Sequence, residues 1–324
     1  MRMIKASSTP GSLRWDGDEL VDAVGGFRRW TPDGVEHASG FEFAYRFDRA
    51  VHSASGRWTV VYEERGTKGV LLDGNDVVRE VDRSDYCAED SDYPVALGVL
   101  RSGREVLIHC PDAYDVLQIE DLITGERLTP GERAAADRFH SRLSMSPDGR
   151  RLLVAGWVWH PHGYAQVFDL EGALRDPAVL DGPGLLSEPA VNCEVASACW
   201  LDANRLAVAG SDRGLGPGAE SLGTRQLGVW SFADGRWLHR SGGDAVWGTL
   251  IACGSDRVVS LTGHPRLVDA TTGAVLEEWP EVEVAHREGA YGVDHLPSPV
   301  AALHPDGTRL AVAQPTGVAV LELA

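Results

Sequence analysis

Five residues able to bind a ligand or move a proton lie in one short segment, WVWHPHGY. They are Trp157, Trp159, His160, His162 and Tyr164. Exposed aromatic rings on a loop can form a stacking wall for a ligand ring or for a side chain of a partner. Equally, the two tryptophans can pack against a neighbouring structural unit. The two histidines have no third metal ligand in sight, so we expect no bound metal here.

A second polar group lies between residues 281 and 298. His286 and Glu288 can form an acid–base pair, and Tyr291 and His295 follow closely. Such sets also occur wherever a surface loop is wet. The segment is therefore a candidate for proton transfer or for simple solvation.

Other motifs for catalysis or cofactor binding are missing from the sequence. The acidic segment 82–93 could attract a basic peptide or a divalent cation, but it lacks the spacing of an EF-hand loop. The glycine-rich segment 210–226 is neither GxGxxG nor a P-loop, and the chain contains no GxSxG. The sequence therefore predicts no cofactor.

The elements that position these residues repeat along the chain. Six short aliphatic runs each begin with arginine and follow a polar turn, at spacings of 47 to 54 residues; they start at Arg57, Arg104, Arg151, Arg205, Arg257 and Arg309. A strand with small residues precedes each turn, and a third strand, a tight turn and a fourth strand follow. Four antiparallel strands in each repeat are typical of a β-propeller, whereas a solenoid unit seldom holds two full hairpins. We expect the six arginines to be structural, because a long charged side chain beside a turn can cover apolar surface and pair with acids.

The segments SPDGRRLLVAG, HPDGTRLAVAQ, VFDLEG and LVDATTG resemble repeats of the WD40 and YVTN-type propeller families. The resemblance covers residues 41 to 324. The glycine–histidine and tryptophan–aspartate signatures of WD40 repeats are largely missing. The resemblance therefore implies the fold and a habit of binding, and no functional residue is carried over.

The repeats predict an all-β chain that forms one propeller domain over residues 1–324. The predicted blades are 41–82, 93–130, 139–181, 195–240, 246–280 and 299–324. The last unit lacks a fourth strand, and we expect residues 12–24 to supply it and close a six-bladed ring. If residues 11–40 form a degenerate blade instead, the ring has seven blades.

The lengths of the loops predict which face of the propeller carries the functional site. Turns between strands one and two, and between three and four, are short and share one face. The long loops gather on the opposite face, which we call the long-loop face, and such loops are more often functional than idle. Trp247 follows a link between two blades, so it should lie near the mouth of the central channel or pack between blades.

Two functions fit this face. The first is a non-enzymatic scaffold that binds a protein, a peptide or a small ligand. The second is a propeller-fold enzyme of hydrolase, lyase, lactonase or cyclase type. It would use His160, His162, His286, Glu288, Tyr291 and His295. We favour the scaffold, because no catalytic motif is present.

Composition narrows the partners and the location. Acidic residues number 48 against 30 basic ones, and the formal charge of −18 disfavours nucleic acid. No apolar run is long enough to span a membrane, and no secretory signal is visible at the amino terminus. The five cysteines form no CxxC, so we expect reduced thiols and a cytoplasmic protein. Lys5 and Lys68 are the two lysines, an arginine bias typical of a GC-rich bacterial genome.

Overall fold

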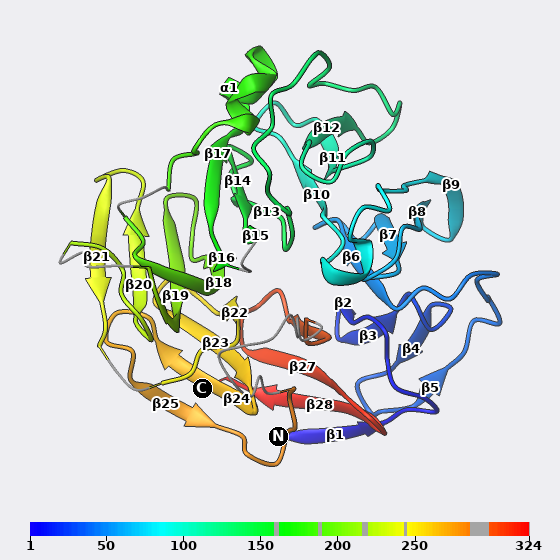
Figure 1. Cartoon of the computed structure of the whole chain (residues 1–324). Coiled ribbons are helices and arrows are strands. Elements are labelled where there is room, and N and C mark those ends of the chain that lie inside the picture. Colours follow the sequence, from blue (N-terminus) through cyan, green and yellow to red (C-terminus); the bar gives the residue numbers. More distant parts are fainter. Residues whose placement is uncertain (159–161, 187–189, 216–219, 243–244, 286–297, 324) are drawn as a thin grey trace.

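The computed structural model describes residues 1–158, 162–186, 190–215, 220–242, 245–285 and 298–323. Within these ranges, seven antiparallel sheets follow one another around a ring in chain order (Figure 1). Blade 1 consists of β2 (Arg14–Asp16), β3 (Glu19–Asp22), β4 (Arg28–Trp30) and β5 (Glu36–His37). Blade 2 consists of β6 (Arg49–His52), β7 (Trp58–Tyr62), β8 (Gly69–Asp73) and β9 (Asp76–Glu80). Blade 3 consists of β10 (Val95–Val99), β11 (Glu105–His109) and β12 (Gln118–Asp121), and blade 4 of β13 (Ser144–Met145), β14 (Arg151–Val154) and β17 (Gln166–Asp169). Blade 5 consists of β18 (Cys193–Trp200), β19 (Arg205–Gly214), β20 (Leu227–Ser231) and β21 (Arg236–Arg240). Blade 6 consists of β22 (Thr249–Ala252), β23 (Arg257–Thr262), β24 (His264–Asp269) and β25 (Val275–Glu278). Blade 7 consists of β26 (Ala301–Leu303), β27 (Arg309–Gln314), β28 (Gly317–Glu322) and β1 (Arg2–Lys5).

The ring is closed by the first strand of the chain. β1 pairs antiparallel with β28, from Arg2 opposite Val320 to Lys5 opposite Gly317, and the blue and red strands lie side by side in Figure 1. Ile4 is buried in the cluster between blades 7 and 1. The two ends of the chain therefore share one sheet, in which β1 is the outermost strand and covers the outer edge of β28.

The ring has seven blades, which was the alternative prediction, and not six. An N-terminal strand does complete the last blade, but that strand is β1 and not residues 12–24. Residues 14–37 form blade 1 by themselves. Its strands are only two to four residues long, and the tryptophans Trp15 and Trp30 supply much of its buried surface. Short strands without a run of β-branched residues give little alternating pattern, so the sequence offered this blade only as an alternative.

Blade 4 also departs from the predicted pattern. Instead of a fourth strand, β17 leads into a short helix, α1 (Leu170–Arg175). The carboxylate of Asp169 accepts a hydrogen bond of 2.9 Å from the amide of Gly172, which caps the helix. At VFDLEG, where the repeat predicts a third strand, a tight turn and a fourth strand, the chain therefore forms a strand followed by a capped helical turn.

Arginines on the short-turn face link neighbouring blades, as expected. Arg151 donates to the carbonyl oxygen of Ala203 at 2.7 Å, in the next blade. Arg205 reaches Asp256 at 2.9 Å, and Arg309 reaches Asp18 at 2.6 Å across the closure. These three arginines are structural links between blades.

All five cysteines are free in the structure. Among the described residues, no helix has the length and apolar character needed to cross a membrane.

Candidate functional site

The structure describes four of the ten candidate residues: Trp157, His162, Tyr164 and Trp247. The other six lie outside the described residues; they are Trp159, His160, His286, Glu288, Tyr291 and His295. Of the six residues that the enzyme interpretation needs, only His162 can therefore be placed.

Trp157 begins a hairpin on the long-loop face, formed by β15 (Trp157–Val158) and β16 (His162–Gly163) between β14 and β17. Its backbone exchanges two hydrogen bonds with Phe139, of 2.9 and 3.0 Å. The neighbouring Gly156 permits this approach, because a Cβ atom there would lie 2.0 Å from the carbonyl oxygen of Phe139. The indole of Trp157 is only 5% exposed, so its ring is reached mainly through its neighbours.

Four aromatic rings in contact lie on the long-loop face between blades 2 and 4. We call this set the aromatic row; it consists of Tyr86, Tyr114, Phe139 and Trp157. The rings of Trp157 and Phe139 are nearly parallel, with centroids 4.2 Å apart, and the centroids of Phe139 and Tyr114 lie 4.7 Å apart. The ring of Tyr86 is tilted by 32° to that of Tyr114 at 4.6 Å, and it also lies 6.2 Å from Phe139. Each ring comes from a different loop or link, and the row ends at Tyr86, which is 48% exposed. One end is thus fixed in the protein while the other faces solvent, as expected of a binding anchor.

A hydrogen bond fixes the middle of the row. The hydroxyl of Tyr114 donates to Asp137 at 2.7 Å. Burial and this hydrogen bond raise the pKa of Tyr114 above its usual range, so the phenol stays neutral and remains a donor. The ring plane next to Tyr86 is therefore held in place.

Tyr164 lies below the row and packs against the core between blades 3 and 4. Its hydroxyl lies 3.3 Å from Nδ1 of His140, whose Nε2 lies 3.0 Å from the carbonyl oxygen of Asp115. Burial lowers the pKa of His140 to about 4 and keeps the ring neutral. Trp247 is also buried, and its indole N–H donates to the carbonyl oxygen of Arg225 at 2.9 Å. In the structure, Tyr164 and Trp247 therefore have packing roles; a binding role for either stays a prediction.

His162 forms a trio with Glu194 and Arg213 that joins the hairpin to blade 5. Nδ1 of His162 lies 2.8 Å from Oε1 of Glu194, and a guanidinium nitrogen of Arg213 lies 2.9 Å from the same oxygen. The carboxylate is almost completely buried, so it can orient an imidazole. The same carboxylate oxygen therefore holds both the imidazole and the guanidinium. The trio therefore fits a positioning role for the hairpin.

The acidic segment 82–93 is an ordered loop held by its own buried arginine, Arg83. The guanidinium of Arg83 donates to the carbonyl oxygens of Ala88 and Asp92 within the segment and of Gly66 outside it. Asp82 pairs with Lys68. Within the described residues, no group of three or more His, Cys, Asp and Glu side chains is placed to hold a metal ion.

Glu64 is buried and connects blade 2 to the segment that leads into blade 7. Its Oε1 accepts from the amide of Ser298 at 3.3 Å, although Ser298 leads into blade 7 and Glu64 belongs to blade 2. Its Oε2 lies 3.0 Å from Arg49. Burial raises the pKa of Glu64 to about 7, and Arg49 only partly opposes this, since Asp92 and Asp48 add negative charge nearby.

This raised pKa predicts a pH-dependent stability. Between the ordinary pKa of glutamate and about 7, the folded protein holds a proton on Glu64 that the unfolded chain releases. The stability contributed by this group is therefore fully present at pH 4.5 and lost as the pH rises through 7. Glutamine imitates the protonated side chain, so we expect the Tm of Glu64→Gln relative to that of the wild type to be higher at pH 8 than at pH 5. The exposed Glu89→Gln is the control and should show a constant difference. A constant difference for Glu64→Gln as well would contradict the prediction.

The comparisons with known proteins agree with the fold. No family model and no curated protein matches the chain. Among solved structures, the chain is similar to a WD40 propeller chain in the crystal structure of the mitotic checkpoint complex, with a TM-score of 0.66 and 15% identity. The match covers 100% of this chain and 95% of that one. At this identity the likeness shows the fold alone: a WD40-like β-propeller.

Proposed function

We propose that the protein is a non-enzymatic scaffold that binds a protein or peptide on its long-loop face, with the aromatic row as the anchor. The observation that carries the proposal is the row itself, which is fixed at Trp157 and open at Tyr86. Aromatic residues backed by rigid packing are the residues that most often dominate the energy of an interface. The structural neighbour from a protein complex supports the same reading.

The surroundings of Tyr86 indicate the chemistry of the partner. The exposed acids Asp85 and Glu89 lie beside Tyr86 in the chain, and the net charge of the whole chain is −18. An arginine or lysine over the open face of the ring would gain a cation–π contact and favourable long-range attraction. We propose a partner segment that inserts a basic residue here. The five free thiols suit a reducing compartment, and we place the protein in the cytoplasm.

Substitution of the exposed ring tests the proposal. Tyr86→Ala should weaken binding of the best peptide from a displayed library by about tenfold or more, since truncated anchor residues commonly cost about 2 kcal/mol. Stability should hardly change, because the ring is exposed at the end of the row. The matched control is Ile123→Ala, which removes a 66% exposed side chain from a turn on the opposite face. Binding can be measured by calorimetry and stability by Tm.

Two results would count against the proposal. One is a library that yields no peptide bound by the wild type. The other is equal binding by the wild type and the Tyr86→Ala variant. Preference for acidic over basic peptides would overturn the assignment of a basic partner while leaving the anchor in place.

A further inference from the structure

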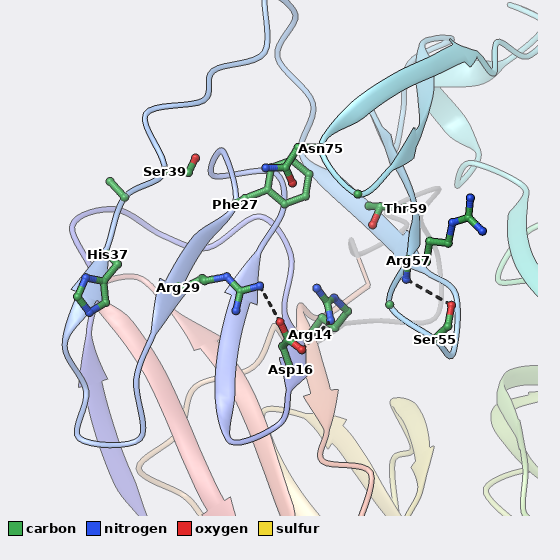
Figure 2. Close-up of a pocket in the computed structure, with 13 residues that line it drawn as sticks. Arg14, Asp16, Phe27, Arg29, His37, Ser39, Ser55, Arg57, Thr59 and Asn75 are labelled. Atoms are coloured by element: carbon green, nitrogen blue, oxygen red, sulfur yellow. Dashed lines mark hydrogen bonds and ion pairs between the residues drawn. The ribbon is translucent and has the colours of Figure 1, made fainter.

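A pocket lies away from the aromatic row, between blades 1 and 2 (Figure 2). Blade 1 lines it with residues of β2 and β4 and with His37 at the end of β5; blade 2 lines it with two turns, at 55–57 and 74–75. The accessible volume is about 500 Å³. This volume is within the range that holds a small organic molecule.

Three arginines line the pocket, although the chain as a whole is acidic. Two of them already have carboxylate partners. Arg57 forms two hydrogen bonds with Asp73, of 2.8 and 2.6 Å. Arg29 binds Asp16 at 2.6 Å and Glu19 at 2.9 Å. The charges of Arg29 and Arg57 are therefore largely neutralised, and their positions are fixed.

Arg14 is different, because its guanidinium lacks close partners. Its nearest carboxylate oxygen, on Asp16, is 4.0 Å away, and its Nη1 makes one long bond of 3.4 Å to the carbonyl oxygen of Trp15. Its Nε is buried and has no hydrogen-bond partner among the described residues. A buried donor without an acceptor is unfavourable, and burial accordingly lowers the pKa of Arg14.

The turn opposite Arg14 leaves room for its guanidinium. Gly56 has a φ of +70°, and a Cβ atom there would lie 2.6 Å from Nη1 of Arg14. A side chain at this position would therefore both strain the turn and press on the guanidinium. The glycine keeps the charged group accessible from the pocket.

Phe27 forms an aromatic wall of the pocket (Figure 2). Its backbone has a φ of +60°, an unfavourable conformation for a bulky residue, and such strain costs on the order of 1 kcal/mol or more. The conformation is held by a hydrogen bond from its amide to the carbonyl oxygen of Ala23 and by contacts with the rings of Phe41 and Phe43. Strained residues of this kind concentrate at binding sites.

We propose that this pocket binds a small monocarboxylate with an aromatic or apolar body, whose carboxylate pairs with Arg14 and whose ring packs on Phe27. A planar carboxylate matches the two parallel donors of a guanidinium. The carboxylate of Asp16 also faces the pocket, 4.0 Å from Arg14, so a doubly charged phosphate ester would meet more repulsion from it than a singly charged acid. The site is independent of the aromatic row and of the function proposed for it.

Phenylacetate is a suitable probe, with phenyl phosphate and benzyl alcohol as its charged and neutral counterparts. We expect saturable binding of phenylacetate by the wild type, measured by calorimetry, and shifts of the amide resonances of Phe27 and Gly56 in heteronuclear NMR spectra. Arg14→Gln should weaken this binding at least tenfold. The control is Arg150→Gln, an exposed arginine outside the pocket, which should bind phenylacetate like the wild type.

Several outcomes would overturn the proposal. Absence of saturable binding by the folded wild type would do so, as would binding that Arg14→Gln leaves unchanged. Tighter binding of phenyl phosphate or benzyl alcohol than of phenylacetate would overturn the carboxylate assignment. The NMR shifts use the wild type alone, so shifts that avoid Phe27 and Gly56 would contradict the site even if Arg14→Gln failed to fold.

Discussion

Deletion of residues 1–6 is expected to lower the free energy of unfolding by about 4 kcal/mol or more and to make the protein self-associate. The deletion removes β1, so β28 loses its partner from Arg2 to Lys5 and becomes an open edge. It also removes Ile4, which is 3% exposed and contacts the cluster between blades 7 and 1. Tm and urea midpoint report the stability, and light scattering reports the association.

Two single substitutions in the same strand separate burial from strand pairing. Ile4→Ala leaves the backbone pairing intact and should cost about 2–4 kcal/mol, the usual range for a buried isoleucine. Met3→Ala alters the adjacent side chain, which is 49% exposed, and should stay within about 0.5 kcal/mol of the wild type. A deletion variant as stable as the wild type would show that β1 does not close the ring.

The part of the fold that could be predicted is the part with fully buried strands. The runs that begin at Arg57 and Arg205 correspond to β7 and β19, whose central residues are buried on both faces. Such strands require continuous aliphatic sequence, which is visible without a structure. Blade 1 lacks this signal, because strands as short as Glu36–His37 carry too few residues to show a pattern.

The candidate site was predicted only as a face. Loop length located the long-loop face, and Trp157 was selected there from its local aromatic neighbours. Tyr86, Tyr114 and Phe139 were missed, because they come from separate loops and meet only after the blades are assembled. The one signal that could have found them is the recurrence of an aromatic residue in successive long loops.

The pocket was missed for a related reason. Arg14 lies in the segment 12–24 that was assigned to a closing strand, Phe27 lies just after that segment, and Gly56 was seen only as part of a turn. No motif joins them, since the pocket forms where two neighbouring blades diverge. Sites built between repeats need the blade count and the register before they can be predicted.

The second large effect is expected at Arg83, where Arg83→Met should destabilise the protein by about 3–5 kcal/mol. The side chain is 9% exposed, and its guanidinium donates to six acceptors: the carbonyl oxygens of Glu64, Gly66, Ala88, Ser91 and Asp92 and the hydroxyl of Ser91. The same group lies 4.9 Å from the ring centroid of Tyr93. Methionine would keep much of the volume but would leave buried carbonyl oxygens without donors, which costs about 1–3 kcal/mol for each group that water cannot reach.

Arg83→Lys should lose most of this stability too, because one ammonium group cannot span acceptors on both sides of the loop. The loss should be local at first, with faster hydrogen exchange and proteolysis across residues 82–93. Since that segment carries Tyr86, peptide binding at the aromatic row should fall along with its order. The control is Arg101→Met, an exposed arginine on the short-turn face, which should remain within about 0.5 kcal/mol of the wild type. If both Arg83 variants kept the protease resistance and urea midpoint of the wild type, solvent rather than Arg83 would have to satisfy the loop carbonyls.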